Sequence, residues 1–395
     1  MVSSSKQCIP LSIPNFEGNE RKYVNEALDA GWVSTGGVFI TRFEEDLAKY
    51  LNVPKVACCQ SGTSALHLSL VECGVKPDDI VIVPTVTFIA AVNPVKYMYA
   101  KPVFIDCDDS LCMDPIKLKE FCEKECEFVD EKLIYKNNQV KALIVVHVFG
   151  NLADMESIMD IAGKYNIKVI EDATEALGTK YISGKFTNRF AGTIGDFGAF
   201  SFNGNKIITT GGGGAVVAKD ENVTLHMKFL STQAKTDPHY YIHDEIGYNY
   251  RMTNIQAAIG VAQIEHLDEF IKRKNKFYDI YLKEFKEFKY GKLLGFREGT
   301  LSNKWFLSLC LDIECIDCEL KDLIEELKVQ GVETRPIWGL IHMQKPYAND
   351  MAYKMDRSLY YYKRVLNIPS STQLVEDDIV NASNIIKKVI LGHIK

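Results

Sequence analysis

One lysine lies where an amine could do covalent chemistry. Lys206 follows an apolar segment at 198–202 and precedes four consecutive glycines at 211–214. A lysine that forms a Schiff base with an aldehyde needs little hydration, a fixed position and a lowered pKa, and a site between a buried strand and a glycine-rich loop offers these. Because lysines are also common in ordinary loops, this stretch by itself leaves both interpretations open.

A carboxylate and a hydroxyl-rich turn extend this hypothesis. Asp172 ends an apolar run, and a carboxylate buried at a strand end needs a partner, such as a protonated pyridine nitrogen, or it takes up a proton. Gly62-Thr63-Ser64 follows a short strand and opens a helix, where backbone amides can bind phosphate, although the same residues suit a simple N-cap. An amine, an acid and an anion-binding turn together are what pyridoxal 5'-phosphate requires.

The elements that must position these residues alternate between strand and helix. Apolar runs predict strands at 56–59, 80–83, 102–106, 142–147, 168–172 and 215–218, and amphipathic runs predict helices at 16–30, 40–51, 88–98, 117–123, 155–165 and beyond 253. This pattern indicates a mostly parallel sheet covered on both faces, which binds ligands at the carboxyl ends of its strands. Thr85, His147, Asp172 and the Lys206 loop all lie at or just past such ends.

The last hundred residues read as a smaller unit. Strands are predicted at 305–312 and 332–336, and helices at 320–330 and 377–391, after a charged helical tract at 272–292. We therefore predict an α/β protein with a large cofactor-binding domain at 1–270, N-terminal helices included, and a small C-terminal α+β domain at 271–395.

Composition excludes several function classes. The 395 residues carry 46 basic and 52 acidic side chains, so nothing favours a nucleic-acid partner. Eleven scattered cysteines indicate reduced thiols, and the Cys315–Cys318 pair lacks the further ligands of a zinc site, so no metal is expected. The longest apolar stretch, 81–95, is interrupted by Pro84 and Pro94, and the first ten residues lack a signal-peptide core. We expect a cytoplasmic protein that does not contact a membrane.

At this point the ordered motifs resemble those of the DegT/StrS sugar aminotransferases over nearly the whole chain. Any one motif is weak, but the full set in this order is highly specific. The motifs are Gly62–Leu66, Pro84–Phe88, Val146–Gly150, Glu171–Gly178, Gly195–Phe202, Asn205–Gly214, Gly247–Ala258 and Glu333–Pro336. The resemblance implies the fold-type I, aspartate aminotransferase-like architecture with pyridoxal 5'-phosphate as cofactor.

The resemblance also implies roles at the cofactor ring. Lys206 would hold the cofactor as a Schiff base and then move protons, so it and Asp172 are the predicted catalytic residues. Asp172 would pair with the pyridinium nitrogen, and Phe88 would stack on the ring face. His147 would lie near Asp172, but an ordinary buried histidine at a strand end explains its position equally well.

Further implied contacts hold the phosphate. Gly62, Thr63 and Ser201 would bind it, with Ser64 in the same turn also counted among the cofactor-binding residues. Asn249 would reach the phosphate of the neighbouring subunit's cofactor, which makes the expected active unit a homodimer with shared sites.

Two positions depart from the family pattern. Glu175 stands where the family usually has glutamine near the cofactor hydroxyl, and it is still expected to lie near the cofactor. Gly212 stands where the family usually has glutamate, a change expected to affect loop packing more than chemistry. Some relatives have histidine in place of the lysine and act as sugar dehydratases, so Lys206 favours amino transfer.

Two N-terminal segments, Ser12–Glu20 and Gly31–Gly36, resemble the branch that acts on nucleotide-linked 4-keto-6-deoxy sugars. That branch includes enzymes for legionaminic acid and bacillosamine, with perosamine synthases close by. The expected reaction moves an amino group from glutamate to C4 of such a sugar, a 2-acetamido hexose, for bacterial surface glycans or flagellin. The alternatives are a GDP-perosamine synthase, a 3-amino sugar transaminase, a dehydratase, or a non-catalytic binding protein on the same fold.

Overall fold

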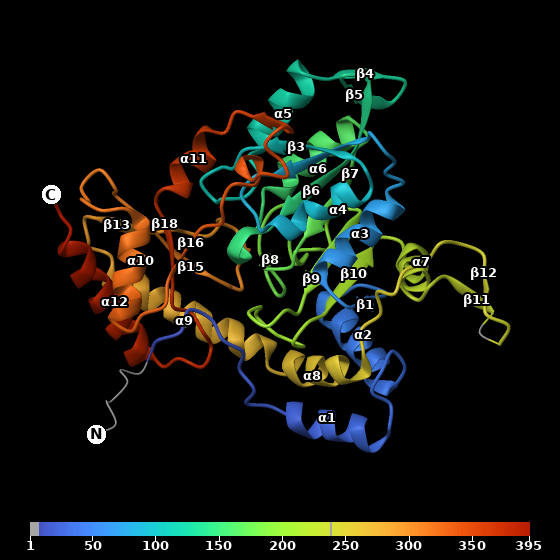
Figure 1. Cartoon of the computed structure of the whole chain (residues 1–395), viewed down its shortest axis with the longest axis horizontal. Helices are drawn as coiled ribbons and strands as arrows, with labels where there is room; N and C mark the ends of the chain where they lie inside the picture. The colour runs from blue at the N-terminus through green and yellow to red at the C-terminus, as the bar shows by residue number, and fades with distance from the viewer. Residues whose placement is uncertain (1–7, 238) are drawn as a thin grey trace.

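A ten-stranded mixed sheet forms the centre of the computed structural model, which describes residues 8–237 and 239–395 (Figure 1). Its main path runs through β1 (Ala57–Cys59), β10 (Gly214–Ala218), β9 (Phe197–Ser201), β7 (Lys168–Asp172), β6 (Asn138–Val146), β2 (Ile80–Pro84), β3 (Lys101–Ile105) and β17 (Met351–Tyr353). From β9 to β17 along this path, neighbouring strands are parallel. β10 is antiparallel to both β1 and β9. Beside β6, β5 (Lys132–Tyr135) is antiparallel to both β6 and β4 (Glu127–Val129). The predicted α/β fold with a mostly parallel sheet is confirmed.

Helices cover this sheet, which explains why its central strands are apolar. All residues of β2 are buried, as are the last five of β6, because helical layers exclude water from both faces. The helices of this part are α1 (Glu20–Asp29), α2 (Val38–Leu51), α3 (Gly62–Glu72), α5 (Pro115–Lys124), α6 (Met155–Lys164), α7 (Glu221–Ser231), α8 (Asn254–Ile264), α9 (Leu267–Glu284) and the short turn η2 (Val148–Gly150). No helix in the described ranges is both long enough and apolar enough to cross a bilayer.

Two predicted helices differ in extent. The helix expected at 88–98 is divided into η1 (Ile89–Ala91) and α4 (Asn93–Tyr97), because Pro94 has no N–H to donate and its ring cannot follow a preceding helical turn. Phe88 is therefore extended backbone rather than helix. The helix expected at 16–30 begins only at Glu20.

The C-terminal residues contribute to two cores. β13 (Gly291–Leu293), β15 (Leu307–Leu311), β18 (Val365–Ile368) and β16 (Arg335–Pro336) form an antiparallel sheet that packs with α10 (Leu320–Val329) and α12 (Glu376–Leu391) around a separate hydrophobic core. In contrast, η3 (Ile341–Met343), β17 and α11 (Asp356–Tyr362) return to the large sheet. There the buried carboxylate of Asp106 accepts the N–H groups of Arg357 and Ser358. The division at residue 270 stays a prediction.

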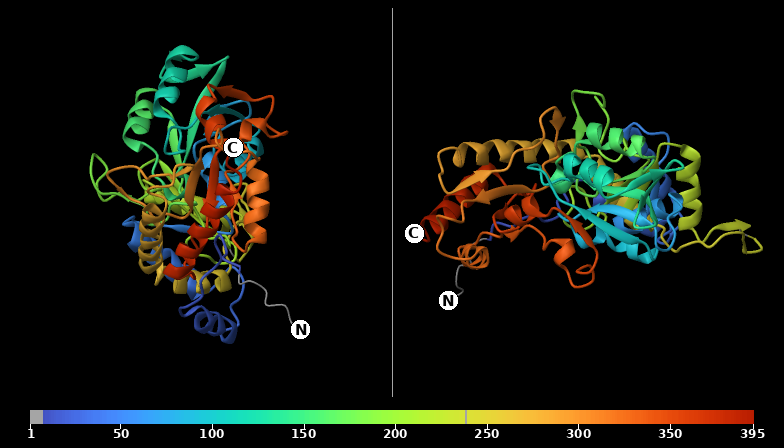
Figure 2. Two further views of the ribbon diagram at one scale, coloured as in Figure 1. Left: turned by 90° about the vertical axis from the view of Figure 1, so that its left-hand side faces the viewer. Right: turned by 90° about the horizontal axis from the view of Figure 1, so that it is seen from above.

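Two small pairs of strands complete the fold. β8 (Lys180–Tyr181) pairs with β14 (Thr300–Leu301) and connects the two parts of the chain. β11 (Lys235–Asp237) and β12 (Ile242–His243) form a ribbon that extends well beyond the body of the molecule (Figure 2). Near its tip Tyr240 and Tyr241 are 81% and 70% exposed. This ribbon leads directly into the segment that contains Asn249.

Candidate active site

A cavity of about 260 Å³ lies at the carboxyl edge of the large sheet. The residues after β7 and β9 line it, together with the first turn of α3, so the sheet topology brings distant motifs to one place. Seven of the nine predicted cofactor residues are in its wall, namely Gly62, Thr63, Phe88, Asp172, Glu175, Ser201 and Lys206. Ser64 and Asn249 are not among its lining residues.

The Lys206 amine is held between an aromatic ring and a carboxylate. Its Nζ lies 4.2 Å from the centre of the Trp305 ring and 3.5 Å from Glu175 Oε1, and its side chain is only 13% exposed. The Trp305 indole N–H donates to the carbonyl of Asn205 at 2.7 Å, which fixes the ring beside the lysine loop. A cation over an indole face is stabilised by the ring quadrupole, so both neighbours favour this position of the amine.

Asp172 is a buried acid at the end of β7. Its Oδ1 accepts the N–H of Thr174 at 3.1 Å, and the residue is 3% exposed. Burial raises the pKa of the Asp172 carboxyl, while the hydrogen bonds from Thr174 and the charge of Lys206 oppose this rise. A cation bound against this carboxyl would keep it ionised.

Glu175 is the second acid in the cavity wall. Its Oε2 accepts the N–H of Phe149 at 2.8 Å, and Oε1 faces Lys206. Burial raises the pKa of Glu175 to about 7, against the lowering effect of the Lys206 charge. Glu175 lies in the cavity wall, and its place near the cofactor and its role there stay predictions.

The first turn of α3 offers backbone amides to an anion. Ser61 caps the helix, because its Oγ accepts the N–H of Ser64 at 3.1 Å and contacts the Ser64 hydroxyl at 2.9 Å. Ser64 is therefore buried behind the turn rather than in the cavity wall. Within the described residues no acceptor pairs with the N–H of Gly62 or Thr63. Two donors at a helix N-terminus form a ready anion site.

Close approach explains two of the glycines. A Cβ on Gly62 would lie 2.8 Å from Thr174 Cγ2, and one on Gly214 would lie 2.4 Å from the Ser61 carbonyl carbon. Side chains there would push β10 and the Asp172 loop away from the anion-binding turn. At Gly212 the nearest atom to an added Cβ is Gln256 Nε2 at 3.7 Å, so a Cβ fits there without a clash.

Two predicted strand-end residues lie behind the cavity. His147 is completely buried, where its Nδ1 accepts the N–H of Ala153 at 3.2 Å and its Nε2 lies 2.9 Å from Glu171 Oε2. Because Nδ1 is the acceptor, Nε2 carries the proton and donates to Glu171. The hydroxyl of Thr85, equally buried, pairs with His342 Nδ1 at 2.6 Å. Both residues hold the strand ends in position.

The two predicted residues of the ring face and the partner site differ in exposure. Phe88 lines the cavity and is 55% exposed. Asn249 is exposed, forms an isolated bridge with Thr232 and takes no part in the lining of this protomer's cavity. The stacking and partner roles of these two residues stay predictions.

Sequence reasoning missed Trp305 and the lysine that fixes it. Lys274 on α9 is buried, and its Nζ donates to the Trp305 carbonyl at 2.9 Å, the Ser370 carbonyl at 2.6 Å and the Ser370 hydroxyl at 3.3 Å. Burial lowers the pKa of Lys274 to about 7. Local sequence patterns do not predict these contacts, because α9, the residues before β15 and the Lys206 loop are far apart in the sequence.

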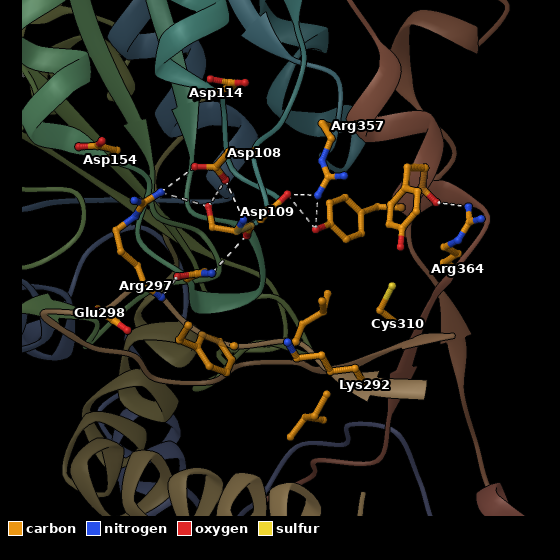
Figure 3. Close-up of a pocket in the computed structure, with 18 of the residues that line it drawn as sticks. Asp108, Asp109, Asp114, Asp154, Lys292, Arg297, Glu298, Cys310, Arg357 and Arg364 are labelled. Atoms are coloured by element: carbon orange, nitrogen blue, oxygen red, sulfur yellow. Dashed lines mark hydrogen bonds and ion pairs between the residues drawn. The ribbon is translucent and has the colours of Figure 1, made fainter. Parts of the chain in front are cut away.

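A larger cavity, about 1820 Å³ in volume, lies between the loops after β3 and β6 and the β13–α11 side of the C-terminal unit (Figure 3). The three arginines in its wall are paired with carboxylates, Arg297 with Asp108, Arg357 with Asp109 and Arg364 with Glu314. None of its lining residues, all of them described, is a predicted cofactor residue. The first two of these pairs thus join the N-terminal and C-terminal parts of the chain.

The small cavity fits a pyridoxal phosphate. Lys206 would offer the amine for its aldehyde, Asp172 a buried acid for its ring nitrogen, and the Gly62–Thr63 turn two backbone amides for its phosphate. This donor set defines the class of a pyridoxal-phosphate enzyme.

Comparison with known proteins identifies the family. Residues 14–388 match the DegT/DnrJ/EryC1/StrS aminotransferase family, and the chain belongs to this family. It is 36% identical over 373 residues to the GDP-perosamine synthase of Escherichia coli O157:H7, covering 94% of this chain and 96% of that one. It is 30% identical over 348 residues to the UDP-4-amino-4,6-dideoxy-N-acetyl-beta-L-altrosamine transaminase of Campylobacter jejuni serotype O:23/36, covering 87% of each.

Solved structures share the fold. Helicobacter pylori PseC, an aminotransferase involved in the biosynthesis of pseudoaminic acid, superimposes with a TM-score of 0.87 at 22% identity, covering 98% of this chain and all of that one. The predicted family, the fold-type I architecture and the pyridoxal-phosphate-dependent sugar aminotransferase class are therefore confirmed.

Proposed function

We propose that this enzyme transfers the amino group of glutamate to C4 of a nucleotide-linked 4-keto-6-deoxy hexose in the cytoplasm. The observation that carries the proposal is the meeting of Lys206, Asp172 and the Gly62–Thr63 amides in one cavity. The names of two relatives, a GDP-perosamine synthase and a UDP-linked 4-amino-sugar transaminase, support this substrate class. Bacterial surface glycans or flagellin of the legionaminic acid type are the proposed destination.

In this proposal the chain's own residues divide the work. The bound cofactor supplies an electron sink conjugated to the reacting carbon. Lys206 would hold the cofactor through its amine and, once freed, would move a proton at Nζ. Asp172, by remaining ionised against the ring nitrogen, would keep that nitrogen protonated. The N–H groups of Gly62 and Thr63 and the Ser201 hydroxyl orient the phosphate, and Phe88 covers the ring face.

Product analysis tests the reaction. We would incubate purified protein with glutamate and UDP-, GDP- or dTDP-linked 4-keto-6-deoxy sugars, and identify the product by NMR. An amine at C4 is expected. An amine at C3, or loss of water without amination, would contradict the proposal. The second candidate substrate is a GDP-linked sugar that has no acetamido group at C2. It is favoured because the GDP-perosamine synthases of three organisms are each 36% identical to this chain.

Trapping tests the assignment of the lysine. Borohydride reduction of the cofactor-loaded protein, followed by peptide mass spectrometry, should place the reduced adduct on Lys206. An adduct on another lysine would overturn the site. This measurement does not depend on knowing the sugar.

We also propose a homodimer with shared active sites, in which Asn249 reaches the partner's cofactor phosphate. The exposed position of Asn249 after the projecting β11–β12 ribbon supports this arrangement (Figure 2). Mixing inactive Lys206→Ala with weakened Asn249→Ala subunits should restore about a quarter of wild-type activity, because half of the dimers are mixed and each has one intact site. Mixtures without any gain would place the whole site within one chain.

A further inference from the structure

The contact between Glu175 and Lys206 leaves the amine unusually free. One carboxyl oxygen of Glu175 is fixed by the N–H of Phe149 at 2.8 Å, while the other lies 3.5 Å from Nζ. Ordinary N–H···O hydrogen bonds measure about 2.7–3.2 Å, so the 3.5 Å contact is loose and leaves the amine with bonding capacity to spare. On its other side the amine lies over the face of Trp305.

We propose that Glu175 accepts the proton of the Lys206 ammonium and so prepares the amine for attachment of the cofactor. This inference rests on Lys206 being the cofactor lysine, as the proposed function has it. It gives the glutamate a task that the family's usual glutamine cannot perform, because a neutral amide has no site for that proton at neutral pH.

The step balances as a proton transfer followed by a condensation. The proton moves from Nζ to Oε1, which converts the ion pair into a neutral amine and a neutral carboxylic acid. The amine nitrogen then bonds to the aldehyde carbon of pyridoxal phosphate. The C=O bond is replaced by C=N, and water leaves with the aldehyde oxygen and both remaining amine hydrogens.

The surroundings of Glu175 make both of its protonation states accessible near neutral pH. Burial raises the pKa of Glu175 to about 7, the nearby Asp172 carboxylate raises it further, and Lys206 lowers it. These are the charged groups that face it, and the Phe149 N–H completes its contacts. An acid whose pKa is near the working pH exchanges protons efficiently in both directions.

The same chain contains a matched control. Glu44 on α2 is also buried, its Oε1 accepts the N–H of Cys58 at 3.0 Å, and its Oε2 lies 2.5 Å from Lys228 Nζ. It thus has one backbone donor and one lysine, like Glu175, but it does not line the cavity. Glu44→Gln therefore removes an equivalent carboxylate without touching the site.

The test measures cofactor attachment rather than turnover. Wild type, Glu175→Gln and Glu44→Gln would be stripped of cofactor with hydroxylamine, checked for folding by circular dichroism, and mixed with pyridoxal phosphate in a stopped-flow spectrophotometer. At about pH 7 we expect attachment to be roughly 10²-fold slower in Glu175→Gln, the usual scale of a general base. Its rate should rise nearly tenfold for each pH unit, because the ammonium must lose its proton to solvent. Glu44→Gln should match wild type.

Equal rates in wild type and Glu175→Gln would overturn the inference, and so would an equal slowing by Glu44→Gln. If Glu175→Gln fails to fold, the wild-type profile decides, since a tenfold rise per pH unit in wild type would show that no internal base acts. Borohydride trapping separates the two proposals. An adduct on Lys206 with unchanged rates refutes only the role of Glu175, whereas an adduct elsewhere refutes the proposed function.

Discussion

Two lysines contact the same tryptophan, Lys206 half-buried and Lys274 buried, and they differ in what surrounds the amine. Lys206 lies over the Trp305 ring with a loose ion pair to Glu175, in the wall of a cavity. Lys274 donates to the Trp305 carbonyl and to both oxygens of Ser370 in closed packing. Its three donors have three acceptors, so no bonding capacity is left over. An amine that is held but not saturated can react, and a saturated one can only stabilise.

Replacement of the reactive lysine should have the largest effect. Lys206→Ala is expected to lower transamination by about 10⁴-fold or more, because the covalent anchor and the proton carrier are lost together. Urea denaturation should show a free energy of unfolding close to that of wild type, since the amine makes no saturated hydrogen-bond network. Near-normal turnover would break the comparison.

Asp172→Asn should follow in size. An amide cannot neutralise a protonated ring nitrogen, so we expect kcat to fall by about 10²–10³-fold. Single-turnover kinetics with glutamate measures this step directly. A change of only a few-fold would mean that Asp172 does not contact the ring, and the fold control is an unchanged circular dichroism spectrum.

Lys274→Met should damage stability rather than chemistry. It leaves the Ser370 carbonyl without its donor and the Trp305 carbonyl with the 3.2 Å hydrogen bond from the Ser370 hydroxyl. This loss should cost about 2–4 kcal/mol in the free energy of unfolding. Lys276→Met on the same helix is the matched control, because Lys276 is exposed and pairs with Glu376, an interaction worth about 0.5 kcal/mol. Chemical denaturation compares the two variants. Equal losses in the free energy of unfolding would show that Lys274 stabilises the fold no more than an exposed lysine does.

Trp305→Phe changes the residue that both lysines contact. It keeps an aromatic face for the Lys206 amine but deletes the donor to the Asn205 carbonyl. We expect kcat/KM to fall by about two- to tenfold, the scale of one hydrogen bond and a weaker cation–π contact. A loss as large as that of Lys206→Ala would make Trp305 a direct participant instead.

The pH dependence of stability should separate the surroundings of Glu175, beside Lys206, from those of Lys274. The raised pKa of Glu175, about 7, means that the folded state binds a proton more tightly, so its stabilisation is present at low pH and is lost as pH rises to about 7. The lowered pKa of Lys274, about 7, means that the unfolded state binds more protons above that pH, so stability rises there. Denaturation across pH should show each slope vanish in Glu175→Gln or Lys274→Met, respectively.

The sequence predicts what local pattern encodes. Apolar runs reveal β2, β6 and β7, and the residues that follow parallel strands must share one edge, so the pattern alone is enough to bring Asp172 and Lys206 together. The placement of Trp305 and Lys274 does not follow in this way, because their contacts join α9, the residues before β15 and the loop after β18. Hydrophobic periodicity does not predict to which distant carbonyl a buried ammonium donates.

A proline and a short strand limit what the sequence predicts about the remaining elements. Pro94 divides a helix whose apolar spacing looks continuous, and three residues of β17 are too few for a recognisable strand pattern. The sequence leaves His147 open between two interpretations, and its complete burial with Glu171 shows a scaffold contact that spacing alone does not distinguish from a site residue.

The edge strand β17 has a consequence for how the enzyme is made. A ribosome releases the N-terminal residues first, so β3 is synthesised some 250 residues before Met351–Tyr353 can pair with it. Until then the outer side of β3 is an open row of backbone donors and acceptors, which other nascent chains can capture. Every truncated product that ends before Met351 therefore keeps the edge of β3 that β17 covers in the full chain.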